Sequence, residues 1–281
     1  MNHPEIFIAV VIVLQLFTYA LGRSLQWLFA PLIGRKGRIW LMAAAFFVSD
    51  GLLAGLLLQL GHFVFRVMAF WMVLLLFVMY AALATFLLHL LLRRLLPQAR
   101  LARALRLFAP LFVAALFGLG LYNAYTPVVR HQSIVIDKKL ARPLRIATTA
   151  DLHLGVLVGG RQLDRLAAIM ETEKPDLILL PGDLMDDDVT AYRRENMRSH
   201  LARLHAPLGV YATLGNHDLF GDEREIYEEL EKAGIRVLAN RVIETDGLII
   251  AGRNDDLDKR RPPTAKLLAG HDTARPVILL D

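Results

Sequence analysis

The sequence predicts an N-terminal transmembrane α-helical unit, residues 1–130, followed by an α/β domain, residues 131–281, because apolar content and charge both change near residue 130. The first part holds the long apolar runs and carries eleven Arg and Lys against two acids, a net charge of +9, whereas the second part has a net charge of −4. The excess positive charge therefore flanks membrane segments and gives no support to nucleic-acid binding. The absence of cysteine excludes a disulfide framework and thiolate chemistry, and it fits an extracytoplasmic domain.

Four apolar segments are candidates for membrane spans: residues 5–21, 39–60, 67–92 and 107–125. A spanning helix needs about 20 largely apolar residues, so the second and third are long enough and the other two are shorter. The first segment lacks a basic leading region and a small-residue cleavage site, which favours a retained helix over a signal peptide.

The basic residues of this unit gather in two of its loops. Arg and Lys cluster between the first and second spans and between the third and fourth, while the second-to-third connection offers only His62 and Arg66. Short loops rich in Arg and Lys stay in the cytoplasm. With four spans, this rule places the N-terminus and everything after Tyr125 outside the cell membrane.

Two polar features of the membrane unit leave alternatives open. Asp50 lies within the second span, where a carboxylate suggests transport or a single polar group facing the bundle interior. We favour the second, with a hydrogen bond to a residue such as Ser49 or Gln15. Residues 23–33, which contain Trp27 and Phe29, fit either an interfacial amphipathic stretch or a plain loop.

Residues 131–281 alternate between expected strands and helices, which is typical of an α/β domain with a covered sheet. We expect strands at 133–136, 144–149, 177–180, 209–213, 236–238, 248–251 and 277–280, and helices at 162–173, 193–204 and 223–233.

Polar clusters follow three successive strands, and each comes directly after an apolar run: Asp151 and His153, Asp183 and Asp186, and Asn216, His217 and Asp218. Sites in α/β sheets form outside the carboxyl ends of the strands, so these clusters can converge. Gly182 and Gly215 allow tight turns and a close backbone approach. Carboxylate and imidazole groups together suit a divalent transition metal. Each cluster alone is as easily a solvated turn, and their joint occurrence favours a site.

The motifs Asp-X-His at 151–153, Gly-Asp-X-X-Asp at 182–186 and Gly-Asn-His-Asp at 215–218 resemble those of the calcineurin-like metallophosphoesterases, in particular the bacterial membrane-attached branch. The resemblance covers roughly residues 131–281. It implies a two-sheet sandwich flanked by helices, with two divalent metal ions (Mn, Fe or Zn) at the strand ends, in a multi-pass protein of the bacterial inner membrane whose catalytic domain is extracytoplasmic.

The resemblance also implies roles for individual residues. The implied metal ligands are Asp151, His153, Asp183 and Asn216. Asp183 would bridge both ions, and His217, oriented by Asp186, would donate a proton or contact the phosphate. Asp218 would be supportive. A hydroxide generated from water by the metals would attack phosphorus in line.

The family pattern includes three further histidine ligands, which lie in His-X-Pro and Gly-His-X-His contexts beyond these motifs. The sequence ends at Asp281, immediately after the expected strand at 277–280, and contains no Gly-His-X-His. We therefore expect a phosphoesterase domain truncated at its C-terminus, because nothing before that residue departs from the pattern. Whether the 281-residue form is active stays open.

The leading interpretation is a membrane-anchored dimetal phosphoesterase that hydrolyses phosphomonoester, phosphodiester or pyrophosphate bonds. Its expected substrates are phosphorylated small molecules or envelope lipids, including nucleotide-sugar lipids such as UDP-diacylglucosamine. One alternative is a non-catalytic membrane protein with a remnant metal- or phosphate-binding domain. Another, the least favoured, is a transporter or sensor acting through Asp50.

Overall fold

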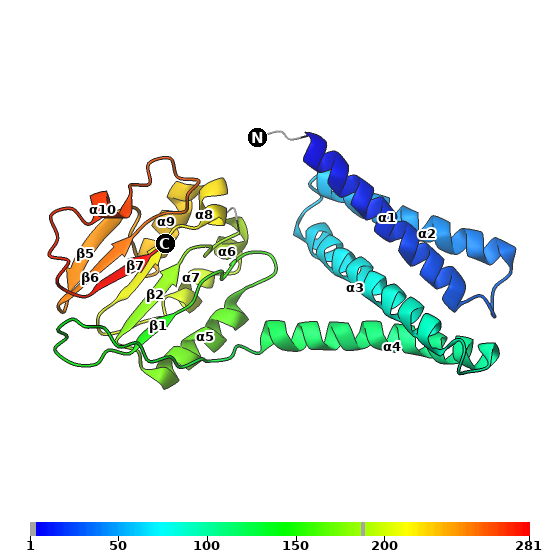
Figure 1. Ribbon diagram of the computed structural model, residues 1–281. Helices are drawn as coiled ribbons and strands as arrows, with labels where there is room; N and C mark the ends of the chain where they lie inside the picture. The colour runs from blue at the N-terminus through cyan, green and yellow to red at the C-terminus, as the bar shows by residue number, and fades with distance from the viewer. Residues whose placement is uncertain (1–3, 187–188) are drawn as a thin grey trace. The chain divides into compact units, whose positions relative to one another are not determined.

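The computed structural model describes residues 4–186 and 189–281, which divide into two compact units, Met1–Thr126 and Pro127–Asp281. The first consists of four long helices, α1 (Pro4–Leu28), α2 (Arg35–Leu57), α3 (His62–Leu92) and α4 (Gln98–Tyr125) (Figure 1). Each is long and apolar enough to cross a membrane. The protein is therefore a membrane protein with four candidate spans among its described residues.

The helices of this unit extend beyond the apolar segments. Helix α1 continues to Leu28, so the stretch 23–33 that the sequence left open begins as helix and ends as a turn. Helix α4 begins at Gln98, nine residues before the expected span, because its first two turns are basic rather than apolar.

The membrane unit has a small interior core and many outward apolar side chains. Leu14 and Leu21 of α1 pack with Ala45 of α2 and Met68 and Leu75 of α3. Leucine and phenylalanine side chains are exposed along all four helices. A bundle that exposes this much apolar surface is stable in hydrocarbon, where burial against another helix offers no hydrophobic advantage.

Asp50 is hydrogen bonded to Gln15, whose Nε2 donates to its Oδ1 over 2.8 Å. The expected type of partner is confirmed, but the expected interior position is wrong, because Asp50 is exposed on the bundle. The interior position beside it belongs to Ser49, which is buried and accepts hydrogen bonds from Thr18 and Trp71.

The second unit is built on a parallel sheet in the order β1-β2-β3-β4 (β1 Ile146–Thr148, β2 Leu177–Pro181, β3 Val210–Thr213, β4 Arg236–Val237). A second sheet has the order β5-β6-β7 (β5 Arg241–Thr245, β6 Leu248–Gly252, β7 Val277–Leu280). Strand β5 is absent from our expectations. The sequence feature that indicates this strand is the dipeptide Asp246-Gly247, which forms the tight hairpin turn from β5 to β6. Both residues have positive φ, +44° and +80°.

Two apolar cores explain the layering of this unit. Leu177 and Leu179 of β2 pack with Ile250 of β6 and Leu280 of β7. This apolar cluster fills the space between the two sheets. The alternate residues of β2, such as Ile178, face the helices. Strand β2 is buried on both faces, as its continuous apolar run predicted.

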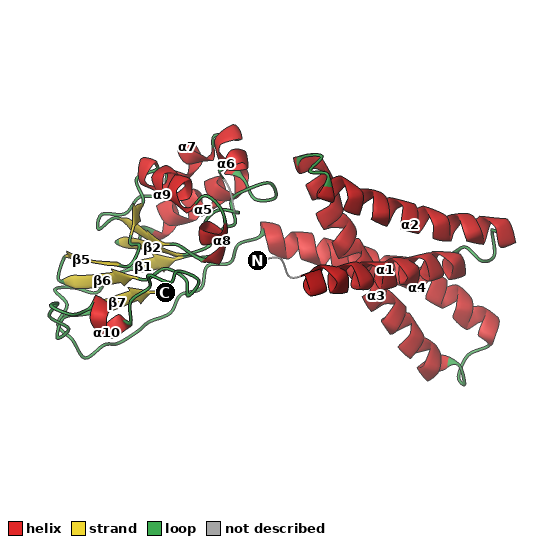
Figure 2. Ribbon diagram, turned by 90° about the horizontal axis from the view of Figure 1, so that it is seen from above, coloured by secondary structure: helices red, strands yellow, loops and turns green. Residues whose placement is uncertain are grey.

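The helices that cover the first sheet are α5 (Gly160–Glu173), α6 (Thr190–Arg194), α7 (Met197–Leu201) and α9 (Glu223–Lys232). Figure 2 shows them gathered on one side of the strands, with α10 (Thr264–Leu267) on the other. The two-sheet sandwich flanked by helices is thus confirmed.

Two expectations about local structure are wrong. The single helix at 193–204 is broken into α6 and α7, because Asn196 adopts a left-handed conformation with φ +51° between them. Residues 133–136 form no strand and pair with none in the part of the chain that the structure describes. Their alternating apolar residues stay exposed, with Val135 96% accessible.

A buried carboxylate ties three of the covering helices together. Glu229 of α9 is 1% exposed and accepts hydrogen bonds from Nε of Arg193 in α6, over 3.1 Å, and Nε of Arg198 in α7, over 2.9 Å. Burial opposes its ionisation, but the hydrogen bonds from Arg198 and Arg193 outweigh that effect and hold the pKa of Glu229 below its ordinary value.

We expect Glu229→Gln to lower the free energy of unfolding of the α/β unit by roughly 1–3 kcal/mol at neutral pH, because the charged acceptor of two guanidinium groups is lost. The folded-state pKa lies below the unfolded one, so the stabilisation is present above the unfolded pKa and disappears as pH falls through the folded pKa. The difference from wild type should therefore shrink in acid.

Hydrogen exchange of α9 amides in the detergent-solubilised full chain measures this loss of stability. The exposed partner Glu225 supplies the control, since Glu225→Gln should change protection by less than about 0.5 kcal/mol. An equal effect of both variants would contradict this assignment.

Candidate metal centre

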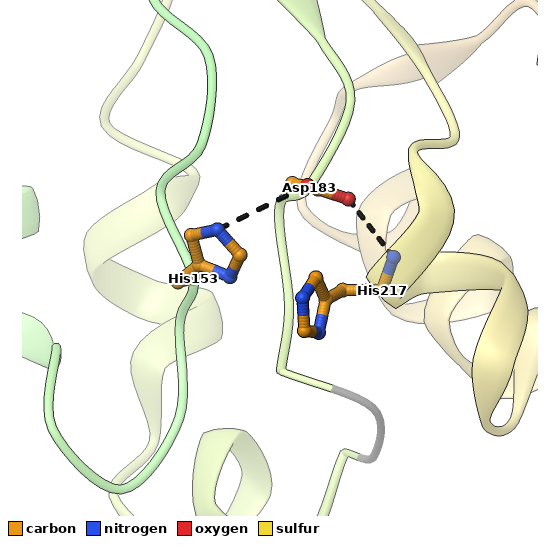
Figure 3. A group of neighbouring side chains, drawn as sticks. All are labelled: His153, Asp183 and His217. Atoms are coloured by element: carbon orange, nitrogen blue, oxygen red, sulfur yellow. Dashed lines mark hydrogen bonds and ion pairs between the residues drawn. The ribbon is translucent and has the colours of Figure 1, made fainter. Parts of the chain in front are cut away.

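Three loops meet at the carboxyl edge of the parallel sheet, and each brings one polar side chain to the same place. His153 follows β1, Asp183 follows β2 and His217 follows β3 (Figure 3). One ligand atom from each side chain lies within 4.8 Å of the others. The predicted convergence of the strand-end clusters is confirmed for these three residues.

The contacts within the cluster are direct. The Nε2 atom of His153 lies 3.9 Å from Oδ2 of Asp183, and the other carboxylate oxygen, Oδ1, accepts the backbone N–H of His217 over 2.9 Å. The two imidazole rings are 4.8 Å apart between centroids and meet edge to face at 82°. Asp183 therefore contacts both histidine residues, the ring of His153 and the backbone of His217.

The candidate ligands occupy an unusual backbone conformation. Asp151, His153 and Asp183 all have positive φ, +54°, +46° and +52°. Such residues cost about 1–3 kcal/mol each and gather at functional sites, where the surrounding structure holds them. Here hydrogen bonds between the loops hold them, because the N–H of Asp151 donates to Gly182 and that of His153 donates to Asp183.

Glycines allow the loops after β2 and β3 to approach each other closely. A Cβ on Gly182, whose φ is +79°, would lie 2.9 Å from Cα of Gly215. A Cβ on Gly215 would lie 2.2 Å from Oδ1 of Asp183 and 2.4 Å from its backbone nitrogen. No side chain fits at either position, so Gly215 sets how near Asp183 comes to the loop that carries His217.

Asp218 holds these two loops together. It is fully buried, and its carboxylate accepts backbone N–H groups of Leu184 and Met185 after β2 and of Gly215 after β3. Burial raises the pKa of Asp218 to about 6, and the three N–H donors oppose that rise. The bond from Gly215 starts helix α8 (Asn216–Phe220), in the manner of an acidic residue at the third helical position. The supportive role expected for Asp218 is positional, and its helix is one that we did not expect.

Asp186 contacts the first histidine of the cluster. Its Oδ1 lies 2.8 Å from Nδ1 of His153. In a histidine that binds a metal through Nε2, a carboxylate at this place accepts the proton of Nδ1. The orienting role that we expected Asp186 to have for His217 stays a prediction, beside this hydrogen bond to His153.

The remaining expected ligands lie in the same loops. Asp151 is exposed and stands outside the group of three that could share an ion. Asn216 is the first residue of α8, between Gly215 and His217, and is half-buried.

The donor set fits a divalent transition metal. Nε2 of His153 and Oδ2 of Asp183 lie 3.9 Å apart, and imidazole nitrogen and carboxylate oxygen are both ligand types of such ions. Asp186 contacts the opposite ring nitrogen, Nδ1, as carboxylates do with histidine ligands of metals. The ligand types do not choose among Mn, Fe and Zn.

Comparison with known proteins agrees with this chemistry. The family model of the calcineurin-like phosphoesterases matches residues 144–275. An uncharacterized metallophosphoesterase of Aquifex aeolicus is 30% identical over 179 residues, which cover 60% of this chain and 67% of the relative. The chain belongs to the calcineurin-like phosphoesterases. It is accordingly a metal-dependent phosphoesterase, a hydrolase of phosphoester bonds.

Two further relatives differ more in length. A transmembrane protein with metallophosphoesterase domain from Danio rerio is 32% identical over 189 residues, 61% of this chain and 43% of the relative. The UDP-2,3-diacylglucosamine pyrophosphatase LpxG of Chlamydia trachomatis is 35% identical over 85 residues, 30% of this chain and 26% of that protein. The chain thus spans two thirds of the Aquifex phosphoesterase and less than half of these two.

The approach of the two loops yields a sharp test. Gly215 has φ −85°, which any residue adopts, so Gly215→Ala introduces only a steric overlap with Asp183. We expect this variant to bind Mn²⁺ at least about tenfold more weakly in titration calorimetry, because Asp183 must move. Gly234 has φ +84° and open space around its missing Cβ. Gly234→Ala should cost about 1–2 kcal/mol of stability and leave Mn²⁺ affinity unchanged. Wild-type affinity in Gly215→Ala would contradict the assigned role of the glycine.

Proposed function

We propose that this calcineurin-like phosphoesterase is a membrane-anchored enzyme with two divalent metal ions, held by Asp151, His153, Asp183 and Asn216. The convergence of His153, Asp183 and His217 at the ends of three adjacent parallel strands is the observation that carries the proposal. Divalent ions held there supply positive charge to a bound phosphate and bring the pKa of water towards neutrality.

The side chains of the site have separate tasks in this proposal. Asp183 contacts both His153 and the backbone of His217 and would be the ligand that the two ions share. Asp186 keeps the proton of His153 on Nδ1, so that Nε2 serves as a ligand. His217 donates a proton to the leaving oxygen or contacts the phosphate. Its position follows from the hydrogen bond that its backbone N–H donates to Asp183.

For the substrate, we propose a phosphoester or pyrophosphate at the envelope that carries a lipid portion. The membrane unit supports this, since it keeps the catalytic domain at a bilayer surface. The name of the Chlamydia relative, a UDP-2,3-diacylglucosamine pyrophosphatase, offers one such substrate. The proposed topology argues for a different lipid, because a UDP-linked substrate would be on the cytoplasmic side.

We propose that the protein resides in the bacterial inner membrane with the α/β unit outside the cytoplasm. The support is the distribution of charge. Arg and Lys gather where α1 is followed by α2, at Arg23 and at the start of α2, and where α3 is followed by α4, in the turn and the first turns of α4, while the turn between α2 and α3 lacks such a cluster.

For the activity, we expect Asp183→Asn to lower kcat/KM for Mn²⁺-dependent hydrolysis of bis(p-nitrophenyl) phosphate by more than about 10², because the bridging charge is lost. Asp186→Asn should weaken Mn²⁺ binding by about 10–100-fold through the orientation of His153. The matched control is Asp272→Asn, in a loop outside the site. Equal rates in wild type and Asp183→Asn would refute the two-metal mechanism.

The topology is tested by fusing reporters after residue 130. Alkaline phosphatase, which is active only outside the cytoplasm, should be active in this fusion, and a green fluorescent reporter should stay dark when exported through the general secretory route. The reverse pattern would overturn the proposed orientation. Fusions after residue 60 should give the same result as those after residue 130, because both points lie on one side when four spans are present.

A further inference from the structure

The membrane unit contains a cavity between α1, α3 and α4 that the proposed function does not use. Its volume is about 710 Å³, within the range of about 300–1,000 Å³ that small-molecule sites occupy. Its walls are mostly apolar and include Trp27, Trp71 and Leu105. The alanines Ala82 and Ala109 leave the space open, because no larger side chain at these positions fills it.

The cavity begins at the basic end of the bundle and runs towards its middle. Its lining includes Arg23 in the last turns of α1 and His89 in the last turn of α3. It ends near Trp71, about 27 Å along α3 from His89 at roughly 1.5 Å per residue. Its length and apolar walls therefore suit an extended hydrocarbon chain that enters from the side of the two basic loops.

The mouth of the cavity carries positive charge that no acid neutralises among the described residues. The only acids of residues 4–126 are Glu5 and Asp50. Glu5 lies at the opposite end of α1 from Arg23. Asp50 lies roughly 22 Å along α2 from Arg35 and is hydrogen bonded to Gln15. A bound group at this end of the cavity is therefore expected to carry negative charge.

The side chains around the mouth are held in place. Arg106 of α4 donates from Nε to the backbone oxygen of Trp27 over 3.2 Å, and its guanidinium lies 5.5 Å from the centroid of that indole. This pair joins α1 to α4 beside the opening. The terminal nitrogens of Arg106 have no acid partner among the residues that the structure describes. Arg106 therefore adds positive charge beside the opening of the cavity.

A polar side chain, Thr85, lies one helical turn deeper in the cavity than His89 at its basic end. Thr85, one turn before His89 on α3, lines the cavity, and its Oγ1 is buried with no hydrogen-bond partner in the described structure. Pro110 of α4 also lines it and has no N–H for the carbonyl oxygen of Arg106. A hydroxyl donor about 6 Å below the charged rim corresponds in depth to the ester groups of a phospholipid.

We propose that this cavity binds one anionic phospholipid of the leaflet that faces the two basic loops. One acyl chain occupies the cavity, the phosphate contacts Arg23 and Arg106, and an ester carbonyl accepts from Thr85. A phospholipid combines the three required parts, and the bilayer supplies it at high concentration. Helices in hydrocarbon gain little by closing an apolar gap against each other, so a chain that fills the void restores the lost dispersion contacts. The site is independent of the phosphoesterase centre.

Tryptophan fluorescence offers a direct measurement. The chain has three tryptophans, of which Trp27 and Trp71 line the cavity and Trp40 is 74% exposed on α2. The full chain carrying Trp40→Phe is reconstituted in phosphatidylcholine vesicles with a small fraction of brominated phosphatidylglycerol or brominated phosphatidylcholine. We expect quenching that saturates at a low fraction of the anionic lipid and rises only gradually with the neutral one. Equal curves for the two lipids would overturn the proposal.

Two pairs of variants locate the bound lipid. Ala82→Leu fills the cavity and should remove the saturable quenching, whereas Ala104→Leu, on the exposed face of α4, should retain it. Arg23→Gln should weaken the preference for phosphatidylglycerol about fivefold, the effect of one cation at a charged membrane surface. Arg100→Gln, in the first turn of α4 at the same basic end of the bundle but outside the lining, should change it less. Saturable quenching that persists in Ala82→Leu would show that the lipid lies around the bundle, and the proposal would fail.

Discussion

The contact between the loop after β2 and the loop after β3 is the constraint on which the site depends. Gly215 lies against Asp183 so closely that a single methyl group would overlap its carboxylate and its backbone nitrogen. The buried carboxylate of Asp218 accepts hydrogen bonds from backbone N–H groups of both loops. The loop after β1 donates three backbone hydrogen bonds to the loop after β2. The left-handed conformations of Asp151, His153 and Asp183 persist because these bonds leave the three loops no other arrangement.

The parallel sheet explains why this constraint produces a site. Strands β1, β2 and β3 are adjacent and parallel, so their carboxyl ends deliver three loops to one edge. Strand β2 is buried between helices on one face and the second sheet on the other. Asp183 therefore follows a rigid element. The two outer loops adjust around it, and their glycines and Asp218 determine how close they come.

Most of the fold followed from local sequence patterns. The apolar runs predicted the four membrane helices and the buried strands, and the glycines before Asp183 and Asn216 indicated the close approach of the loops. The missed strand β5 had a local signal in the turn at Asp246-Gly247, whereas two other failures depended on contacts that are distant in sequence. Residues 133–136 alternate like a strand but lie beside no partner in the described chain. The break at Asn196 serves the meeting of Arg193 and Arg198 on the distant Glu229. Sequence placed Asp186 in the site beside His217, and the structure adds its hydrogen bond to His153.

The charge of the site adds to its backbone strain. Asp151, Asp183 and Asp186 bring three carboxylates to two neighbouring loops, and a fourth, Asp218, is buried beneath them. Like charges at this separation repel, and the raised pKa of Asp218 records burial together with the nearby charge of Asp183. A cation bound between His153 and Asp183, as we propose, would relieve this repulsion. Its binding would then be coupled to the folding of this edge, and the free energy that strain and repulsion cost the protein would return as affinity for the metal.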